Sequence, residues 1–210
     1  MKTNKPILGI LGAGKLGVVL AQLALKAGYQ VLISGSGDPS KIALSVKVLT
    51  PGAQAASPQA VAVNSDLVVL ALPLSKYKHI PRQALKDKLV IDAMNYWWEV
   101  DGQMPDLEAA SSSSEMVQAY LSDSRVTKAL SHMGYHNLLD DARAMGATDR
   151  KAIAIASDYD SDVKIVAQLI DDLGFDPVHI GPLASGKHLQ PGTELFGSSV
   201  PAAAIRQAVN

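Results

Sequence analysis

The stretch Pro6–Gly17, PILGILGAGKLG, decides the fold of this 210-residue chain. Its apolar residues 6–11 predict a buried strand, and the pattern GxGxxG follows at once. The apolar-rich residues 18–27 then predict a helix. A strand, a tight glycine turn and a helix N-terminus in this order are typical of a site that binds the pyrophosphate of a dinucleotide. We therefore expect the turn itself to bind one, through Gly12, Ala13, Gly14, Lys15, Leu16 and Gly17.

The composition narrows the class of protein. Hydrophobic residues make up 48% of the chain, charged residues 19%, and the net charge is −1, which is ordinary for an α/β protein and gives no general attraction to nucleic acid or to an anionic membrane. The chain has no cysteine, which excludes disulfides, thiolate metal sites and cysteine nucleophiles. The first residues predict neither a signal peptide nor a transmembrane helix. We expect a cytoplasmic protein whose partners are small molecules or copies of itself.

Strand-like and helix-like segments alternate along the chain, a pattern that predicts an α/β fold of the Rossmann type, with a doubly wound, mainly parallel sheet. Further strands are expected at 30–34, 67–73, 88–93, 125–130, 151–156 and 177–180, with a short one between 50 and 60. Helices are expected at 40–49, 115–120, 160–173 and 202–209, and a polar linker at 99–113. Residues 1–150 would form the dinucleotide-binding domain, and residues 151–210 a small C-terminal lobe that continues the fold.

The end of the second strand indicates which dinucleotide binds. NAD-selective sites carry an acid there for the ribose 2′-hydroxyl, whereas this chain has Ser34, Gly35, Ser36 and Gly37. Hydroxyls, backbone N–H groups and the nearby Lys41 suit a 2′-phosphate, so we expect NADP. Two alternatives stay open: Asp38 could fold back as the missing acid, and Lys41 could be a solvated helix residue.

Several segments together carry a family resemblance: the glycine turn, the serines after the second strand, Leu70–Pro73, Val90–Tyr96, Val126–His132, Leu173–Val178 and Gly181–Leu183. With them the chain resembles the F420-dependent NADP oxidoreductases, and it is similar to the NADPH-binding domain of six-transmembrane ferric reductases. The segments Tyr96–Trp98 and Met133–His136 look more like a bacterial subgroup of dinucleotide-binding reductases. The resemblance implies NADPH as hydride donor, a flavin or coenzyme F420 as co-substrate, and a homodimer.

The resemblance also implies positions for the cofactor. Ser34, Ser36 and Lys41 match the 2′-phosphate site of the family, although its usual arginine is absent. Leu72 and Pro73, in the segment after the fourth strand, would line the nicotinamide, and we add Asn95 to the cofactor-binding residues. Where the family often has His or Asn followed by Thr, this chain has Ser131-His132, so the acceptor cannot be transferred from the family.

Aromatic and histidine residues follow two expected strand ends, in the segments 95–98 and 131–136. A planar electron acceptor could stack on these rings; alternatively they cover the core or a dimer interface. Reduction of a carbonyl or imine would need a proton donor, and His132, Tyr135 and Tyr96 are the catalytic candidates. No Tyr-x-x-x-Lys motif occurs, which favours a flavin-like acceptor. His132 and His136 are four residues apart, but Gly134 disfavours a helix there and we expect no metal site.

The sequence thus predicts hydride transfer between NADP(H) and a flavin- or deazaflavin-like acceptor. One rival is an imine or ketone reductase of the pyrroline-carboxylate reductase type, although the roughly 30 residues after Gly181 are too few for the long helical dimerisation domain of that class. Another rival is an NADP-binding sensor without catalysis.

Overall fold

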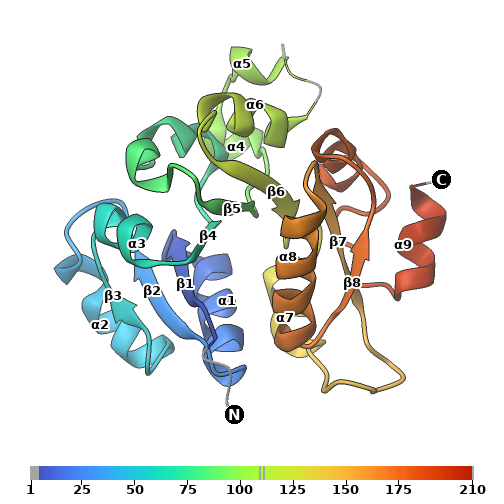
Figure 1. Cartoon of the computed structure of the whole chain (residues 1–210), viewed down its shortest axis with the longest axis horizontal. Coiled ribbons are helices and arrows are strands. Elements are labelled where there is room, and N and C mark those ends of the chain that lie inside the picture. The colour runs from blue at the N-terminus through green and yellow to red at the C-terminus, as the bar shows by residue number, and fades with distance from the viewer. Residues whose placement is uncertain (1–4, 109, 111, 210) are drawn as a thin grey trace.

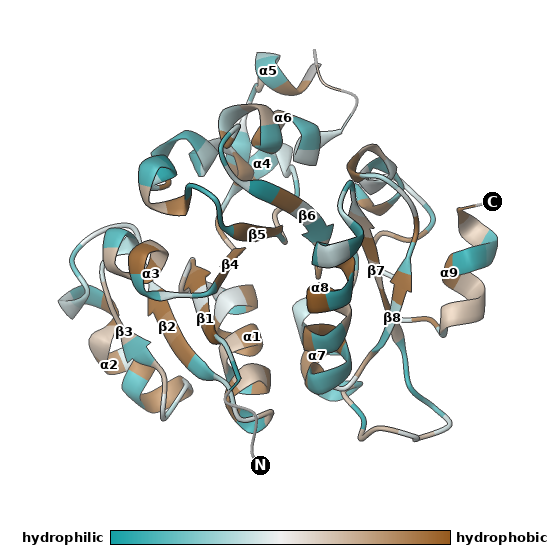
Figure 2. Cartoon of the chain, in the orientation of Figure 1, coloured by the Kyte–Doolittle hydropathy of each residue, from teal (hydrophilic) through white to brown (hydrophobic). Residues whose placement is uncertain are grey.

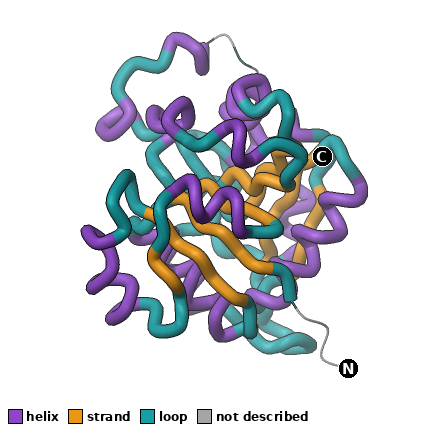
Figure 3. The backbone as a smooth tube through the Cα atoms, turned by 60° about the vertical axis from the view of Figure 1, so that its left-hand side comes forward, coloured by secondary structure: helices purple, strands orange, loops and turns teal. Residues whose placement is uncertain are grey.

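The computed structural model describes residues 5–108, 110 and 112–209. One eight-stranded sheet runs through it, in the order β3-β2-β1-β4-β5-β6-β7-β8, with helices on both faces (Figures 1 and 3). The strands are β1 Ile7–Leu11, β2 Gln30–Ser34, β3 Gln54–Ala55, β4 Leu67–Leu70, β5 Leu89–Asp92, β6 Arg125–Ala129, β7 Ala152–Ser157 and β8 Asp176–His179.

The helices connect these strands in the alternation that the sequence predicted. The α-helices are α1 Lys15–Lys26, α2 Ser40–Leu49, α3 Pro58–Asn64, α4 Trp98–Asp101, α5 Pro105–Glu108, α6 Ser113–Tyr120, α7 Tyr135–Asp140, α8 Asp160–Leu173 and α9 Ala202–Ala208. Three 3₁₀ helices, η1 Leu74–His79, η2 Arg82–Leu85 and η3 Leu183–Leu189, complete the described elements. None of the helices in this described part has the length and apolar character needed to cross a bilayer.

Neighbouring strands are parallel except β6 and β7, which pair antiparallel. The first six strands have the doubly wound order 3-2-1-4-5-6, so the chain reverses its winding direction between β1 and β4. The predicted Rossmann-type α/β fold is confirmed. Strands β7 and β8, from the predicted C-terminal part, extend the same sheet.

The sheet is hydrophobic on both faces because helices cover both (Figure 2). Along β4, Leu67 and Val69 pack toward α1, α2, α7 and α8, whereas Val68 and Leu70 pack toward α3, α6 and the 3₁₀ helices η1 and η2. Beyond β6, the second face of β7 is covered by η3 and α9 through Leu189 and Ile205.

One expectation was wrong. The described part of the predicted polar linker 99–113 includes most of one four-residue helix, α4, and all of another, α5. The carboxylate of Asp101 holds the first of them, because it accepts hydrogen bonds from the backbone N–H groups of Ser75, at 2.8 Å, and Trp97, at 2.8 Å. Helices this short leave no periodic pattern in a sequence.

Candidate functional site

The glycine turn between β1 and α1 is shaped by backbone contacts. Gly12 has a φ of +126°, and a Cβ at this position would lie 2.0 Å from the carbonyl oxygen of Ala71. A Cβ on Gly17 would lie 1.8 Å from the carbonyl oxygen of Gly12. At Gly14, by contrast, no described atom outside its chain neighbours and its helix lies within 4 Å of the Cβ position. Gly12 and Gly17 are therefore required by the turn itself, whereas Gly14 keeps its surface open to a ligand.

Helix α1 begins at this turn with its N-terminal N–H groups available. Within the described structure no side chain caps it, and its first turn carries no acidic residue. The first N–H groups of a helix have no partner within it, and the helix dipole places partial positive charge there. Lys15 adds a full positive charge, which the helix dipole disfavours at this end. This end of the helix is suited to an anion.

The end of β2 lies beside the glycine turn, since the Gly12 N–H donates to the Ser34 carbonyl at 2.9 Å. The Ser34 side chain is buried, and its Oγ has no hydrogen-bond partner among the described residues. Ser36 and Lys41 are exposed. Gly35 packs closely against Ile42, because a Cβ on Gly35 would lie 3.0 Å from Cγ2 of Ile42.

Asp38 is held at the start of α2. Its Oδ1 accepts the backbone N–H of Ser40 at 2.8 Å, and this hydrogen bond lowers the pKa of the exposed carboxyl group below its usual value. The structure thus gives Asp38 a local role that does not involve the end of β2.

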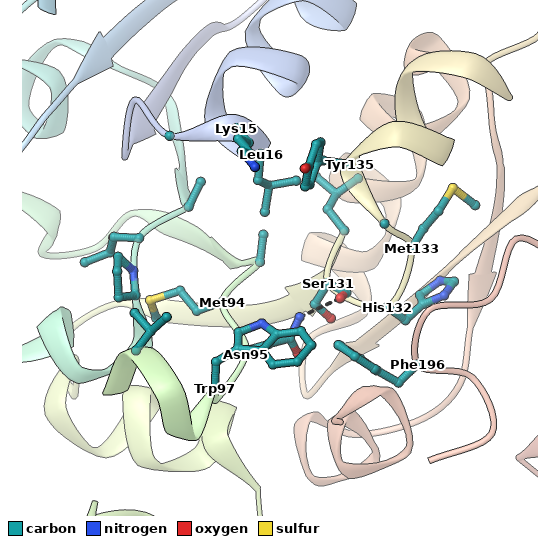
Figure 4. Close-up of a pocket in the computed structure, with 18 of the residues that line it drawn as sticks. Lys15, Leu16, Met94, Asn95, Trp97, Ser131, His132, Met133, Tyr135 and Phe196 are labelled. Carbon is teal, nitrogen blue, oxygen red and sulfur yellow. Dashed lines mark hydrogen bonds between the residues drawn. The ribbon is translucent and has the colours of Figure 1, made fainter. Parts of the chain in front are cut away.

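A cavity of about 790 Å³ extends from the N-terminus of α1 across the carboxyl ends of β4, β5 and β6 (Figure 4). In a doubly wound sheet this edge is where ligands bind. The lining brings together eight of the residues named from the sequence as cofactor-binding or catalytic candidates: Gly14, Lys15, Leu16, Leu72, Pro73, Asn95, His132 and Tyr135. The other lining residues are Ala71, Ala93, Met94, Trp97, Val100, Asp101, Leu130, Ser131, Met133, Gly134, Phe196 and Gly197.

Much of the cavity wall is apolar and aromatic. The rings of Trp97 and Phe196 meet edge to face, with centroids 5.4 Å apart and an interplanar angle of 62°. Trp97 is half exposed, and Trp98, also exposed, is not part of the lining. Asp101 is the one acidic residue in the lining as described, and both its oxygens already accept backbone N–H groups. The wall therefore favours a flat, largely uncharged ligand.

His132 is a buried residue of the cavity lining, and its ring is turned toward β7. Its Nε2 accepts the backbone N–H of Ala154 at 3.1 Å, so the neutral ring carries its proton on Nδ1. Burial lowers the pKa of His132 from 6.5 to about 4, against a smaller opposing effect of the Leu195 carbonyl. Its own carbonyl accepts the N–H of Gly197 at 2.7 Å. The ring is thus neutral near pH 7, which fits a structural role better than proton donation.

This burial predicts a pH dependence of stability. Because the folded protein keeps His132 neutral while the unfolded chain protonates it near pH 6.5, folding stability is full above pH 6.5 and falls as the pH drops toward about 4. The expected loss is about 3 kcal/mol at the acid end. Urea unfolding at pH 7.5, 5.5 and 4.5 measures it. His132→Gln should lose most of this pH dependence, whereas His79→Gln, at an exposed site, should keep it. If the free energy of unfolding changes equally with pH in the parent protein and both variants, the pH dependence does not come from His132.

The two candidate tyrosines differ in position. The hydroxyl of Tyr96 donates to the Gly102 carbonyl at 2.9 Å, and Tyr96 does not line the cavity. The ring of Tyr135 does line it, and the Lys15 ammonium lies 5.5 Å from the ring centroid (Figure 4). Of the two, Tyr135 is the phenol within reach of a ligand.

The rings of His132 and His136 lie in different surroundings. The ring of His136, on α7, stacks at 4.1 Å between centroids on Tyr135, whereas the ring of His132 faces Ala154. In the described part of the chain, no three histidine, aspartate or glutamate residues form a group that could hold a metal ion.

A buried ion pair lies beneath the cavity. Lys128 on β6 and Asp92 on β5 are fully buried, with 3.2 Å between Nζ and Oδ2. Asp92 also accepts the Ser114 hydroxyl at 2.6 Å and the Met94 N–H at 2.9 Å, while Lys128 donates to the Met94 carbonyl. Both ends of this pair therefore clamp the backbone of Met94, directly before Asn95.

Sequence reasoning missed this pair and the place of Phe196. Lys128 lies in a strand-like run, VTKAL, where a lysine would ordinarily face solvent. One signal was available: Asp92 and Lys128 both stand near the carboxyl ends of expected neighbouring strands, where parallel pairing brings side chains together. Phe196 stands in a glycine-rich tail without periodicity, and nothing in the sequence places it against Trp97.

Residues 7–96 match the model of a family described as NADP oxidoreductase, coenzyme F420-dependent. A 73-residue stretch is 34% identical to the YjhV protein of Escherichia coli strain K12 and makes up 35% of this chain. The match covers 50% of YjhV, so it spans only half the length of that relative.

Solved structures share the fold over most of the chain. A hypothetical protein from Sinorhizobium meliloti has a TM-score of 0.82 and 25% identity, with coverage of 94% of this chain and 96% of that one. A proposed F420-dependent NADP reductase from Arthrobacter sp. FB24 has a TM-score of 0.74 and 20% identity, covering 87% and 88%. The 1-pyrroline-5-carboxylate reductase of Streptococcus pyogenes has a TM-score of 0.60 and 14% identity, covering 84% and 58%. The last two likenesses concern the fold.

Proposed function

We propose, from the premise that residues 7–96 belong to the family of coenzyme F420-dependent NADP oxidoreductases, that this protein transfers hydride between NADP(H) and a flavin- or deazaflavin-like acceptor. The observation that carries the proposal is the single cavity that joins the open N-terminus of α1 to the aromatic wall of Trp97 and Phe196. Hydride donor and acceptor must lie in contact, and one continuous cavity allows both to bind side by side.

The residues of the turn fit a dinucleotide. The space over Gly14 and the uncapped end of α1 suit a pyrophosphate, and Lys15 supplies a further positive charge. Leu72 and Pro73 line the cavity where the chain leaves β4, and would bind the nicotinamide end. NADPH supplies the hydride; the protein supplies orientation and a wall that excludes water.

Preference for NADP is supported by the end of β2. Ser36 and Lys41 are exposed there and would bind the 2′-phosphate. Because Oδ1 of Asp38 accepts the N–H of Ser40, we propose no role for this carboxylate on the ribose. Ser34, being buried, would support the loop from below.

Introducing a carboxylate at this position tests the preference. We expect Ser36→Asp to weaken NADPH binding by about tenfold or more, through repulsion of the 2′-phosphate, and to change NADH binding little. Fluorescence titration with both nucleotides measures the two dissociation constants. Ser45→Asp adds the same charge to an exposed position of α2 and serves as the control. If Ser36→Asp leaves the NADPH to NADH ratio of the parent protein unchanged, the phosphate does not bind there.

The acceptor is tested by single-turnover kinetics. The protein, loaded with NADPH, is mixed in turn with riboflavin, FMN, coenzyme F420, a ferric chelate and a quinone, and absorbance at 340 nm follows oxidation. We expect oxidation by one of the flavin or deazaflavin compounds above the rate without protein. Tight NADPH binding without oxidation by any acceptor would instead favour a sensor. Homodimer formation and a cytoplasmic location stay predictions from the sequence.

One observation favours a second candidate, reduction of a carbonyl or imine. Tyr135 lines the cavity beside Lys15, and a phenol near a positive charge can donate a proton to such a substrate. Tyr135→Phe separates the two candidates. It should slow carbonyl or imine reduction by about a hundredfold or more and leave hydride transfer to a flavin nearly unchanged.

A further inference from the structure

Asn95 and Ser131 meet at the carboxyl ends of β5 and β6, in the lining of the cavity (Figure 4). The amide nitrogen Nδ2 of Asn95 donates to the backbone carbonyl of Ser131 at 2.6 Å. A carbonyl oxygen can only accept a hydrogen bond, so the atom that faces it must be the NH₂ group. The orientation of the Asn95 amide is thereby fixed.

This orientation leaves Oδ1 of Asn95 as a free acceptor. The atom is buried and has no hydrogen-bond partner in the part of the chain that the structure describes. The Ser131 side chain is 5% exposed, and its Oγ is likewise buried without a described partner. Buried polar atoms are ordinarily paired, so unpaired atoms on residues that line a cavity point to a ligand that pairs them. Three such atoms occur among the described lining residues, Asn95 Oδ1, Ser131 Oγ and His132 Nδ1, and the first two are on residues joined by the hydrogen bond above.

Together the two side chains offer one acceptor and one hydroxyl donor. We infer that Asn95 and Ser131 recognise a planar N–H/C=O edge, with the N–H donating to Asn95 Oδ1 and the C=O accepting from Ser131 Oγ. The inference rests on the proposed function, which supplies two sources of this edge: the carboxamide of the nicotinamide and the imide of a flavin or deazaflavin ring. Ser131 is thereby assigned as a further binding residue.

The pair is held in place before any ligand arrives. Asp92 and Lys128 bind the N–H and the carbonyl of Met94, which fixes the backbone on which Asn95 stands. On the other strand, His132 follows Ser131 and is tied to β7 by its ring and to Gly197 by its carbonyl. A preorganised binding site of this kind loses little conformational entropy when the ligand binds. It also discriminates strongly against ligands that lack either the N–H or the C=O group.

The nicotinamide source is tested with NADP⁺ and its 3-acetylpyridine analogue, in which a methyl group replaces the amide nitrogen and the carbonyl remains. Isothermal titration gives both dissociation constants. We expect the unmodified protein to bind NADP⁺ about tenfold or more tightly than the analogue. In Asn95→Leu this ratio should fall to near one, because the acceptor of the N–H is gone. In Ser131→Ala the ratio should persist while both ligands bind more weakly.

The acceptor source is tested in parallel with riboflavin and N3-methylriboflavin, in which the imide N–H is blocked. If the ring imide is the group that binds, Asn95→Leu should abolish the difference in dissociation constant between riboflavin and N3-methylriboflavin. The ratio of dissociation constants for NADP⁺ and its 3-acetylpyridine analogue should then be the same in Asn95→Leu and in the unmodified protein. Asn64→Leu is the matched control: this exposed asparagine donates to the Ala60 carbonyl at 2.9 Å on α3, and its removal should change neither ratio.

The outcomes separate the inference from the proposed function. The inference is overturned if the unmodified protein discriminates within neither pair of ligands, or if discrimination persists unchanged in Asn95→Leu. Failure to bind NADP⁺ at all would overturn the proposed function, and the riboflavin pair would still decide whether the edge is read. If Asn95→Leu folds poorly, Ser131→Ala is titrated with the two pairs of ligands instead. An equal loss of affinity for both members of a pair supports the inference, and unchanged affinity overturns it.

Discussion

Replacing Gly17 by alanine is expected to unfold most of the protein. The added Cβ would lie 1.8 Å from the carbonyl oxygen of Gly12, a backbone atom that is itself fixed by the turn. The helix and strand would have to separate, at an expected loss of more than about 4 kcal/mol, which is comparable with the whole stability of many domains. Thermal unfolding followed by circular dichroism measures the loss.

Gly14→Ala is the matched control for this change, three residues before Gly17 in the same motif, at the N-cap of α1. Its Cβ would meet nothing within 4 Å, and its φ of −81° suits any residue. We expect stability within about 1 kcal/mol of the parent protein, together with weaker NADPH binding, because the methyl group would occupy the space offered to the phosphates. Equal stability losses in the two variants would refute the division of roles among these glycines.

Breaking the buried pair of Lys128 and Asp92 is the second change with a large expected effect. Lys128→Met leaves the carboxylate of Asp92 buried without its cation, and Asp92→Asn leaves the ammonium without its anion. Each should destabilise the protein by about 3–5 kcal/mol. The double variant should lose clearly less than the sum, because it removes both charges together. Urea unfolding of the four proteins gives this coupling directly.

An exposed pair provides the comparison. Lys78 and Asp106 are 2.6 Å apart on the surface, with side chains more than half exposed. Lys78→Met should leave the urea midpoint unchanged within error, since water screens such a pair. If Lys128→Met behaved as mildly as Lys78→Met, the pair beneath the cavity would not be buried in solution. Its clamp on Met94 would then be too weak to hold Asn95.

The fold could be predicted from the sequence largely because the strongest local signals agree with it. The glycine turn stands between a strand and a helix, and the continuous apolar run at 67–70 is typical of the central parallel strand that it forms. Helix α8 begins and ends where its pattern does, since Gly174 terminates it in the left-handed region, with a φ of +105°. At these positions the local sequence and the tertiary fold favour the same secondary structure.

The site was less accessible to sequence reasoning, because its residues come together only through the sheet. Tyr135 and Lys15 are 120 positions apart, and no motif links them. Tyr96 looked equivalent to Tyr135, but the turn before Gly102 captures its hydroxyl. His132 was one of three candidate proton donors, and the sequence could not separate that role from a structural one; burial lowers its pKa and keeps its ring uncharged near neutral pH. The direction and burial of a side chain depend on residues that are close in the fold but distant in the sequence, and sequence patterns do not identify them.

The contact of Phe196 with Trp97 has a consequence for the order in which the site is assembled during synthesis. The turn, the ends of β4 and β5 and Asn95 are all complete once residue 96 has emerged from the ribosome. The opposite wall depends on β6, on His132 and finally on Phe196 and Gly197, a hundred residues later. A nascent chain therefore holds the residues proposed to bind the nucleotide about a hundred residues before Phe196, which completes the wall proposed to face the acceptor.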